Sequence, residues 1–416
     1  MVLLFSHSGF SDTEANGITM KNLLAEWQPQ EKAEFYCNVS APDFTAAHRY
    51  FRVTDMQMIK AFLFRKSQHI FTYTGETAQT NSNPKKSSAR KIPGVLKKQK
   101  YNFGIKWLRE IMWRFSPWGH RKLRRWIEET DPEVLVYMVG ESLFMDRKVL
   151  KACRKRPLVL YNCEAYRIID LNGRHGIERA YYRKCQKNYK KLQDRASLVI
   201  YNSKMLQDGY EAMYPKKAET MVAYNSAESK TSAYTPKKTV TVSYFGNLGV
   251  GRTKSLVIAA RCLQDLGLHL DVYGAADEQT EKQLRECEAI RLRGFLQKEE
   301  LQEVLEKSDI LLHAESFEPE IVKKLRYAFS TKIAQCLCAG RCLVSFAPEQ
   351  IASTQYLKSV GMPIAASEQE LKTLLKELVS KPEVRTAYAR RALDIGRKNH
   401  HTPQVRKEIG AILNEM

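Results

Sequence analysis

Tyr244-Phe245-Gly246-Asn247-Leu248-Gly249-Val250-Gly251-Arg252 is the segment that decides the fold. It closes a short apolar run and precedes a helical pattern, so it predicts a turn from a buried strand into a helix. Glycines let the backbone approach a phosphate closely, and the helix that follows offers its positive N-terminus. The spacing is not that of the dinucleotide-binding G-x-G-x-x-G pattern, and the chain has no G-K-[ST] phosphate loop. NAD binding and a P-loop nucleotidase are therefore disfavoured.

A second cation stands in a similar setting. Lys332 lies in Phe329-Ser330-Thr331-Lys332-Ile333, where a loop turns into a predicted helix. Arg252 and Lys332, each beside backbone N–H groups, are suited to hold a diphosphate from both sides. A protein that grips a diphosphate leaving group is expected to move the sugar attached to it.

Short apolar runs alternate with longer amphipathic segments along the whole chain, which predicts parallel sheets covered by helices. In the first half we expect strands at residues 2–5, 134–138, 158–161, 198–201 and 221–224. After a polar stretch the pattern restarts, with strands at 239–245, 268–273, 309–314 and 342–346 and helices at 254–266, 298–307 and 332–339. The predicted organisation is an N-terminal domain (1–226), a linker (227–238), a C-terminal domain (239–395) and a final helix (396–416) that packs back on the first domain.

The strongest compositional signal is a formal charge of +21 on 416 residues, which implies an anionic partner. Residues 85–125 contain fourteen Lys or Arg and one acid, and so supply thirteen of the twenty-one charges. Nine irregularly spaced cysteines give no disulfide framework, which favours a reducing cytosol. No apolar run is long enough to span a bilayer, so we expect a cytoplasmic protein, peripheral on the inner face of the cell membrane.

The segment 85–126 combines this charge with tryptophans, as in helices that lie in the headgroup region of an anionic membrane. The residues expected to bind the membrane are Lys97, Lys98, Lys106, Trp107, Arg109, Trp113, Arg114 and Trp118. One alternative is a solvated basic face whose aromatic residues pack on their own domain. Another is nucleic-acid binding, against which stands the absence of zinc-finger spacing and of an RRM-type aromatic signature.

The second half resembles a known family. The similarity is to the donor domain of GT-B glycosyltransferases of the retaining family 4 group. It rests on the order of the segment 244–252, Gly294-Phe295, residues 308–317, and Phe329-Ser330-Thr331-Lys332-Ile333 with the helix into Gly340. The resemblance covers residues 240–400 well, and the rest of the chain in domain order. It implies two Rossmann-like domains facing across a cleft, with a nucleotide-sugar donor in the C-terminal half and the acceptor in the N-terminal half.

The resemblance implies that Arg252 and Lys332 contact the diphosphate, where fixed cations stabilise charge that develops on the leaving group. No D-x-D sequence occurs, so we expect neither a metal ion nor another cofactor. Further donor-binding candidates are Gly246, Asn247, Gly249, Ser330, Thr331 and Gln335. The chain departs from the family at the two glutamates separated by seven residues, since Gln335 and Tyr327 stand near these positions. Glu315 is the candidate to replace the first of them, and a surface carboxylate is its alternative.

The N-terminal half resembles the family less specifically. Asn16 and Gly17 resemble the loop through which the acceptor domain meets the donor phosphates, although a turn before a helix explains them equally well. Glu164 follows a predicted strand and is the candidate for orienting or deprotonating an acceptor hydroxyl.

Taken together, the sequence predicts a GT-B glycosyltransferase at a membrane surface. The expected acceptor is a lipid-linked saccharide or polysaccharide of the bacterial cell envelope, and other glycosyltransferases are possible partners. Nucleic acid is not an expected partner. The competing predictions are a catalytically silent GT-B partner of another transferase, which the unusual Gln335 supports, and a nucleic-acid-binding protein.

Overall fold

The computed structural model describes residues 1–12, 14–64, 71–74, 102–115, 117–215, 218–229 and 233–416. The chain forms two compact units. Unit 1 comprises Met1–Asn202, Leu206–Ala223 and Arg406–Met416, and unit 2 comprises Ser203–Met205 and Tyr224–Val405. The boundary thus falls three residues before the predicted one, and the expected linker belongs to unit 2.

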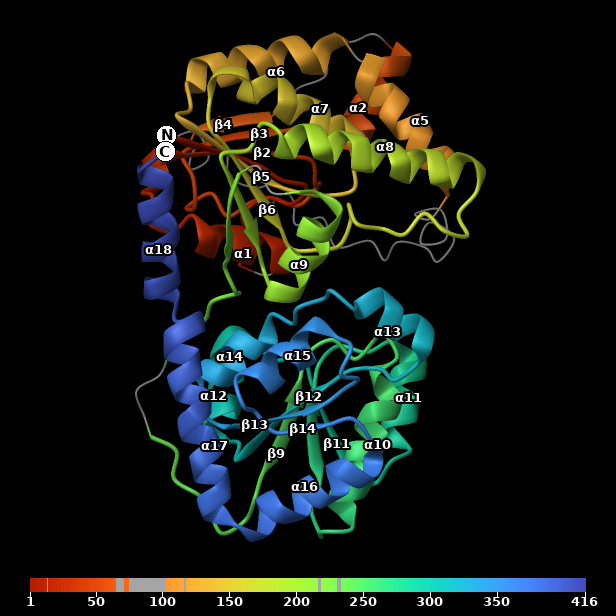
Figure 1. Cartoon of the computed structure of the whole chain (residues 1–416), viewed down its shortest axis with the longest axis vertical. Helices are drawn as coiled ribbons and strands as arrows, with labels where there is room; N and C mark the ends of the chain where they lie inside the picture. Colours follow the sequence, from red (N-terminus) through yellow and green to blue (C-terminus); the bar gives the residue numbers. More distant parts are fainter. Residues whose placement is uncertain (13, 65–70, 75–101, 116, 216–217, 230–232) are drawn as a thin grey trace. The chain divides into compact units, whose positions relative to one another are not determined.

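Unit 1 is built on one sheet with β1 at its centre (Figure 1). Among the described residues the strand order is β4 (Phe71–Thr74), β3 (Arg49–Arg52), β2 (Lys32–Tyr36), β1 (Val2–Phe5), β5 (Val134–Met138), β6 (Leu158–Asn162), β7 (Leu198–Tyr201) and β8 (Glu219–Val222). All pairs are parallel except β3 with β4. The helices are α1 (Ala15–Leu23), α2 (Asp55–Phe64), α5 (Phe103–Phe115), α6 (Pro117–Thr130), α7 (Leu143–Ala152), α8 (Gly176–Gln193), α9 (Lys204–Met213) and α18 (Thr402–Asn414).

Unit 2 holds a fully parallel sheet in the order β11 (Ile290–Gly294), β10 (Leu270–Tyr273), β9 (Val242–Phe245), β12 (Ile310–Ala314), β13 (Cys342–Phe346) and β14 (Ile364–Ala365). Its helices are α10 (Arg252–Gln264), α11 (Glu278–Arg285), α12 (Lys298–Lys307), α13 (Pro319–Leu325), α14 (Lys332–Cys338), α15 (Ala352–Ser359), α16 (Glu368–Ser380) and α17 (Pro382–Ile395). Ser367 caps α16 by accepting a hydrogen bond from the Glu370 N–H.

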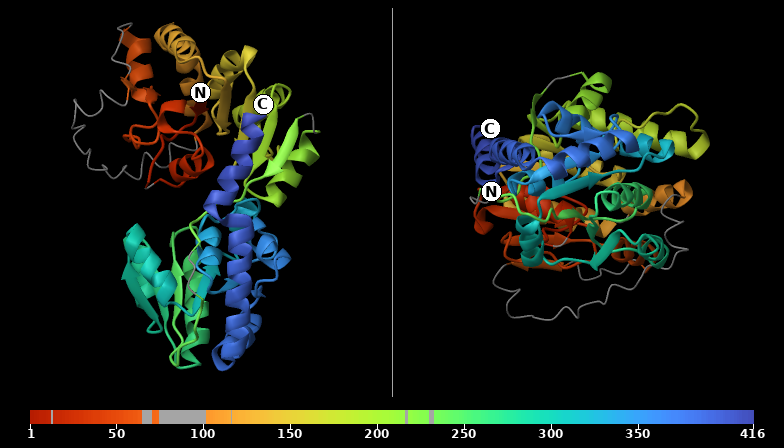
Figure 2. Two further views of the ribbon diagram at one scale, coloured as in Figure 1. Left: turned by 90° about the vertical axis from the view of Figure 1, so that its left-hand side faces the viewer. Right: turned by 90° about the horizontal axis from the view of Figure 1, so that it is seen from below.

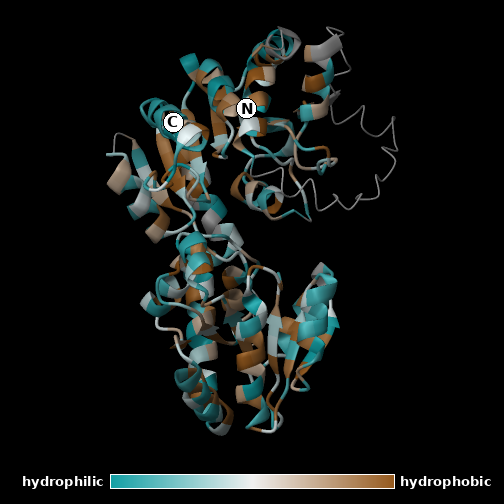
Figure 3. Ribbon diagram, turned by 90° about the vertical axis from the view of Figure 1, so that its right-hand side faces the viewer, coloured by the Kyte–Doolittle hydropathy of each residue, from teal (hydrophilic) through white to brown (hydrophobic). Residues whose placement is uncertain are grey.

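Burial on both faces explains why the strands of unit 2 read as continuous apolar runs and not as alternating ones. In β12, Ile310, Leu312 and Ala314 pack into the core below α10 and α16, whereas Leu311 packs into the opposite core with α14 and α15. Figure 3 shows apolar ribbon concentrated in the strands of both units.

The end of the chain leaves unit 2 and joins unit 1. After α17, Gly396–His400 forms a π-helical turn, and α18 follows (blue in Figure 2). Arg406 at the start of the unit 1 portion donates to the Asn22 side chain of α1 at 3.3 Å. The last helix therefore packs on the N-terminal part of the chain.

Candidate functional site

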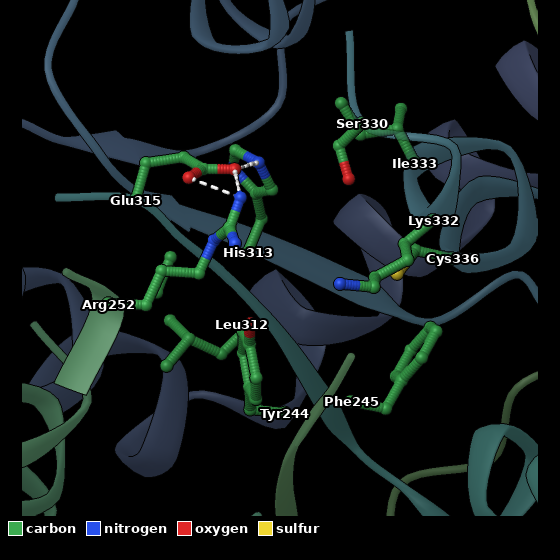
Figure 4. Close-up of a pocket in the computed structure, with 11 residues that line it drawn as sticks. Tyr244, Phe245, Arg252, Leu312, His313, Glu315, Ser330, Lys332, Ile333 and Cys336 are labelled. Carbon is green, nitrogen blue, oxygen red and sulfur yellow. Dashed lines mark hydrogen bonds and ion pairs between the residues drawn. The ribbon is translucent and has the colours of Figure 1, made fainter. Parts of the chain in front are cut away.

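The site lies where the strand order of unit 2 reverses. The chain runs from β9 outward through β10 to β11 and then returns to the other side of β9 as β12. In open α/β sheets, ligands bind beyond the carboxyl ends of strands at such a switch point. The pocket found there is lined by Tyr244, Phe245, Arg252, Leu312, His313, Ala314, Glu315, Ser330, Lys332, Ile333 and Cys336 (Figure 4).

Lys332 is the first residue of α14, and its side chain reaches across to the end of β9. The ammonium lies over the Tyr244 ring, 5.7 Å from its centre, and its last carbons pass where a side chain on Gly246 would stand. Figure 4 shows the Nζ pointing into the pocket. Within the part of the chain that the structure describes, this ammonium makes no hydrogen bond or ion pair.

Burial and the nearby Arg252 charge lower the pKa of Lys332 to about 8, although Glu315 acts in the opposite direction. The ammonium is therefore charged at neutral pH but poorly solvated. Buried charges in folded proteins are normally paired. An unpaired, half-buried ammonium facing a pocket indicates that the site takes an anion.

Arg252 is held differently, in an ion pair with Glu315. Its Nη2 lies 2.9 and 2.7 Å from the two carboxylate oxygens, and both side chains are nearly buried, with 12% and 7% exposure. His313 extends this arrangement, since its Nε2 lies 3.5 Å from Glu315 and its Nδ1 lies 3.0 Å from the Ser345 hydroxyl. A chain of polar side chains from β13 through β12 thus fixes the orientation of the Arg252 guanidinium.

This pairing changes the interpretation of Glu315. Burial alone would raise the pKa of its carboxyl, but His313 and Arg252 together lower that pKa to about 2. A carboxylate so acidic is a poor general base at neutral pH. The structure therefore places Glu315 as a residue that positions Arg252, and not as the surface carboxylate of the alternative prediction.

The glycine-rich loop is held in an unusual conformation before α10. Val250 and Gly251 both have left-handed φ angles, 62° and 71°. Such a φ is a true outlier for a β-branched residue, and outliers of this kind gather at functional sites. The Asn247 side chain accepts from the Gly249 N–H at 2.8 Å, and Arg252 donates to the Asn247 and Gly249 carbonyls at 3.4 and 3.3 Å. Asn247 and Gly249 thus shape the loop beside the pocket.

The remaining donor candidates of unit 2 differ in their placement. Ser330 lines the pocket, and its backbone N–H is fixed by the Ser353 hydroxyl at 2.9 Å. Thr331 is exposed at the N-cap of α14. Gln335 is half-buried one turn further along α14 and is not among the residues that line the pocket.

Gly246 is required for this arrangement, which gives a first prediction. A Cβ at position 246 would overlap the Nζ and Cε of Lys332, and the φ of 137° disfavours any other residue. Because the lysine end is flexible, we expect Gly246→Ala to fold but to displace the ammonium, weakening nucleoside-diphosphate binding at least about tenfold. Isothermal titration calorimetry with UDP, GDP and ADP measures this.

Gly267→Ala is the matched control. Gly267 also has a left-handed φ, 70°, but a Cβ at this position would meet no other atom within 4 Å. Gly267→Ala therefore changes only the conformational free energy of the backbone, and its nucleotide affinity should equal that of the wild type. Equal affinities for Gly246→Ala and Gly267→Ala would contradict the proposed role of the Lys332 ammonium.

The candidates of the N-terminal half lie in unit 1. Gly17 is buried in α1, where a Cβ would lie 2.6 Å from the Gly9 carbonyl, so it allows the helix to pack on the preceding loop. Asn16 is exposed beside it. Glu164 follows β6 with an exposed side chain, and its carbonyl accepts from the Tyr210 hydroxyl at 2.8 Å. Donor contact by Asn16 and Gly17, and acceptor contact by Glu164, stay predictions.

The basic, Trp-rich segment is used largely for packing inside unit 1. Trp113 is 1% exposed, stacks on Phe144 and donates to Asp55, so its predicted membrane contact is wrong. Trp107 packs against Tyr181. The alternative in which the aromatic residues pack on their own domain thus holds for both tryptophans.

The cations of the same segment divide into two groups. Lys106 pairs with Glu141 at 2.9 Å and Arg109 with Asp55 at 2.8 Å, so both are engaged within unit 1. Arg114 is exposed. Lys97 and Lys98 lie outside the described residues, as does the side chain of Trp118.

Among the pocket residues that sequence reasoning missed, His313 and Tyr244 are the two that contact the predicted charged residues. His313 and Glu315 are two residues apart at the end of a strand, so period-two alternation places them on one face, and this signal was available. Tyr244 gave no such signal, because its role depends on α14 bringing Lys332 over its ring.

The comparisons with known proteins concern first the C-terminal part of the chain and then the whole chain. Residues 252–410 match a family described as glycosyl transferase-like. No curated protein matches the sequence. Among solved structures, HepE from Anabaena in complex with UDP superposes over 100% of both chains with a TM-score of 0.65 and 12% identity.

Two further structures share the fold. Sucrose-phosphate synthase from Thermosynechococcus elongatus matches over 100% of this chain and 98% of its own, with a TM-score of 0.62 and 9% identity. The lipopolysaccharide outer core galactosyltransferase WaaB in its apo form matches over 100% of both chains, with a TM-score of 0.58 and 13% identity. At such identities the likeness establishes the fold.

The two Rossmann-like units and the pocket at the switch point define a protein of GT-B fold, as predicted. The glycosyl transferase-like family match covers residues 252–410, which lie almost entirely in unit 2. None of the described helices is both long and apolar enough to cross a membrane. Among the described residues, no cluster of His, Cys, Asp and Glu is arranged to hold a metal ion, and all nine cysteines are free thiols.

Proposed function

We propose that the protein transfers a sugar from a nucleoside-diphosphate sugar, with the diphosphate held in the pocket of unit 2. The observation that carries this proposal is the Lys332 ammonium at the switch point of the sheet, which has no partner among the described residues and lies beside the Arg252–Glu315 ion pair. HepE, whose structure contains UDP, shares this fold and supports a nucleotide as the ligand.

The arrangement suits departure of a diphosphate. As the bond between the sugar and the diphosphate breaks, negative charge grows on the leaving oxygen. Lys332 supplies a cation whose poor solvation makes its attraction for that charge strong. Arg252, oriented by Glu315, presents a second cation, and the loop before α10 presents backbone N–H groups at a helix N-terminus. On this proposal the chain's own cations neutralise the leaving group without a metal ion.

The finer parts of the proposal concern the acceptor. We propose a family 4-like, retaining enzyme acting on a lipid-linked saccharide of the bacterial cell envelope at the cytoplasmic face of the membrane. The net charge of +21 supports an anionic, membrane-borne acceptor, and WaaB, a lipopolysaccharide transferase, shares the fold. Glu164 in unit 1 is the candidate for orienting the acceptor hydroxyl.

A panel of nucleoside diphosphates tests the donor site directly. Ligands that bind the folded state raise the thermal midpoint by mass action. We expect one of UDP, GDP, ADP or dTDP to raise the midpoint of the wild type but not that of Lys332→Ala. If no member of the panel shifts the midpoint of the wild type at millimolar concentration, the donor-site assignment is incorrect.

A second function is supported by Gln335, which stands where the family carries a charged ribose-binding residue. An amide hydrogen-bonds hydroxyls without charge assistance, which favours a binding-only partner of another transferase. Release of nucleoside diphosphate from the matching sugar nucleotide separates the two functions. Turnover by the wild type supports the enzyme, whereas equal background release by the wild type and Lys332→Ala supports the silent partner.

The titration of Lys332 gives a prediction on pH. A lysine whose pKa is lowered to about 8 keeps its proton at pH 7 and loses it progressively above pH 8. We therefore expect nucleoside-diphosphate affinity to fall by up to about tenfold between pH 7 and pH 9, limited by the rise in the lysine pKa that a bound anion causes. Titrations at fixed ionic strength measure this dependence.

Lys332→Arg is the control for the pH experiment. An arginine stays charged over this range, so its affinity should change little between pH 7 and pH 9. An affinity of the wild type that is constant or rises over the same interval would show that the ammonium does not contact the diphosphate.

A further inference from the structure

Helix α5 of unit 1 exposes an apolar stripe on the side that faces away from its packing contacts. Ile105, Leu108, Ile111 and Phe115 are 44%, 55%, 44% and 62% exposed. At about 100° per residue these four positions fall within one third of the helix circumference. The stripe is thus continuous along the helix and not a scatter of single exposed residues.

The opposite side of α5 is fully used by unit 1. Trp113 is buried against Phe144, Glu110 is buried and pairs with Arg147 at 2.9 Å, and Arg109 pairs with Asp55. α5 packs on α2, α7 and α8 through this side (Figure 1). The orientation of the helix is therefore fixed, and its apolar stripe stays outside the core.

One cation lies against the stripe, and others follow it on the next helix. The Arg114 guanidinium lies over the Phe115 ring, 5.5 Å from its centre, and Arg121 and Lys122 are exposed on the first turns of α6, which follows directly. Over residues 102–115 and 117–130 there are seven Lys or Arg and three acids, a balance of +4. An apolar stripe with a cationic border is the composition of a helix that lies in the interface of an anionic bilayer.

We infer that the stripe Ile105, Leu108, Ile111 and Phe115 is the surface by which unit 1 inserts into an anionic membrane, with Arg121 and Lys122 on the lipid headgroups. This inference rests on the part of the proposed function that places the acceptor at a membrane. It moves the contact from Trp107 and Trp113, which pack on residues of unit 1, to aliphatic side chains and Phe115. α5 then lies in the plane of the membrane.

The charge and the apolar character of this surface favour an anionic membrane over a second copy of the chain or a nucleic acid. A second copy of the chain would bring the same cations against Arg121 and Lys122, so a symmetric contact is opposed by repulsion. Nucleic acid would use the cations but offers no partner for isoleucine and leucine, because bases stack on aromatic rings. An anionic bilayer satisfies both the apolar stripe and its border.

The test is flotation of the full chain with vesicles of phosphatidylglycerol and phosphatidylcholine, compared with phosphatidylcholine alone. We expect the wild type to float with the anionic vesicles and Leu108→Ser/Phe115→Ser to show at least about a tenfold lower partition coefficient. Arg121→Gln/Lys122→Gln should also bind less and lose part of its salt dependence.

The matched control is Met213→Ser/Phe295→Ser. It removes two apolar side chains that lie outside α5 and are 42% and 69% exposed. It should float like the wild type. Equal flotation of the stripe variant and the wild type would overturn the inference, as would flotation equally strong with neutral vesicles. A concentration-dependent dimer that the stripe variant abolishes, without flotation, would assign the surface to a second copy instead.

Nucleotide binding tests the proposed donor site independently of the proposed membrane surface. The stripe variant should retain the thermal shift produced by the nucleoside diphosphate that binds the wild type, because the stripe belongs to unit 1 and the pocket to unit 2. If the wild type binds nucleotide but stays at the bottom of the gradient, the membrane surface is refuted and the donor site is not. A wild type that floats but binds no nucleotide refutes the donor site alone.

Discussion

Lys332→Ala is expected to lower kcat/KM for the sugar nucleotide by about 10²–10³, equivalent to roughly 3–4 kcal/mol of lost transition-state stabilisation. The reason is that Lys332 is the cation of the pocket without a partner among the described residues, whereas Arg252 is already paired with Glu315. The loss should appear mainly in kcat, because the charge that the ammonium neutralises grows as the bond breaks. Steady-state assays of nucleoside-diphosphate release measure the effect.

The thermal stability of Lys332→Ala and a variant of another lysine of unit 2 serve as controls. Removing an unpaired, poorly solvated ammonium should leave the thermal midpoint of the ligand-free protein unchanged or slightly higher. Lys324→Ala, at an exposed position of α13, should keep normal activity. If Lys332→Ala retained more than about half of the wild-type kcat/KM, the leaving-group role would have to be abandoned.

The second large effect concerns the stability of unit 1. Arg167 and Asp146 form a fully buried ion pair, with Arg167 Nη2 and Nη1 at 2.7 and 3.0 Å from the two carboxylate oxygens. Removing one member leaves the other charge buried and unpaired, which costs about 3–5 kcal/mol. We therefore expect Arg167→Met to lower the free energy of unfolding of unit 1 by about this amount.

Tryptophan fluorescence during urea titration measures this effect selectively, because all five tryptophans belong to unit 1. Arg167→Met/Asp146→Leu should recover part of the loss, since an apolar pair of similar volume leaves no unpaired charge. Arg125→Ala is the surface control, because its pair with Glu129 is 83% and 56% exposed and is worth at most about 1 kcal/mol. A loss below about 1 kcal/mol for Arg167→Met would show that the pair is dispensable.

The sheet of unit 2 was well predicted, whereas three of the eight strands described in the sheet of unit 1, β2, β3 and β4, were not. β9, β10, β12 and β13 are buried on both faces, so each appears as an apolar run. β2 was missed because Lys32 and Glu34 interrupt its pattern. Glu34 is nevertheless buried: burial raises its pKa to about 8, and Ser6 and the Phe10 N–H donate to its carboxyl. A neutral, hydrogen-bonded carboxyl is tolerated in a core, but only the folded environment creates it.

The roles of the pocket residues depended on contacts distant in sequence. Arg252 and Lys332 were predicted from their loops to contact a diphosphate, and the structure brings both to one pocket. The pairing of Arg252 with Glu315, 63 residues away, was not predicted, and it turns a candidate catalytic carboxylate into a positioning residue. Local sequence patterns contain no information on such pairs.

By itself, the sequence determined the alternation of strands and helices, the two glycine- and serine-containing turns and the cations that follow them, because these depend on local preferences and on hydrophobic periodicity. The tertiary structure decided which cation lacks a partner among the described residues and which face of α5 packs inward. It buried Trp113 and left Leu108 and Phe115 exposed, although all three belong to one helical pattern. The physical reason is that solvation and pairing of a side chain are set by neighbours far along the chain, which only the packed fold brings together.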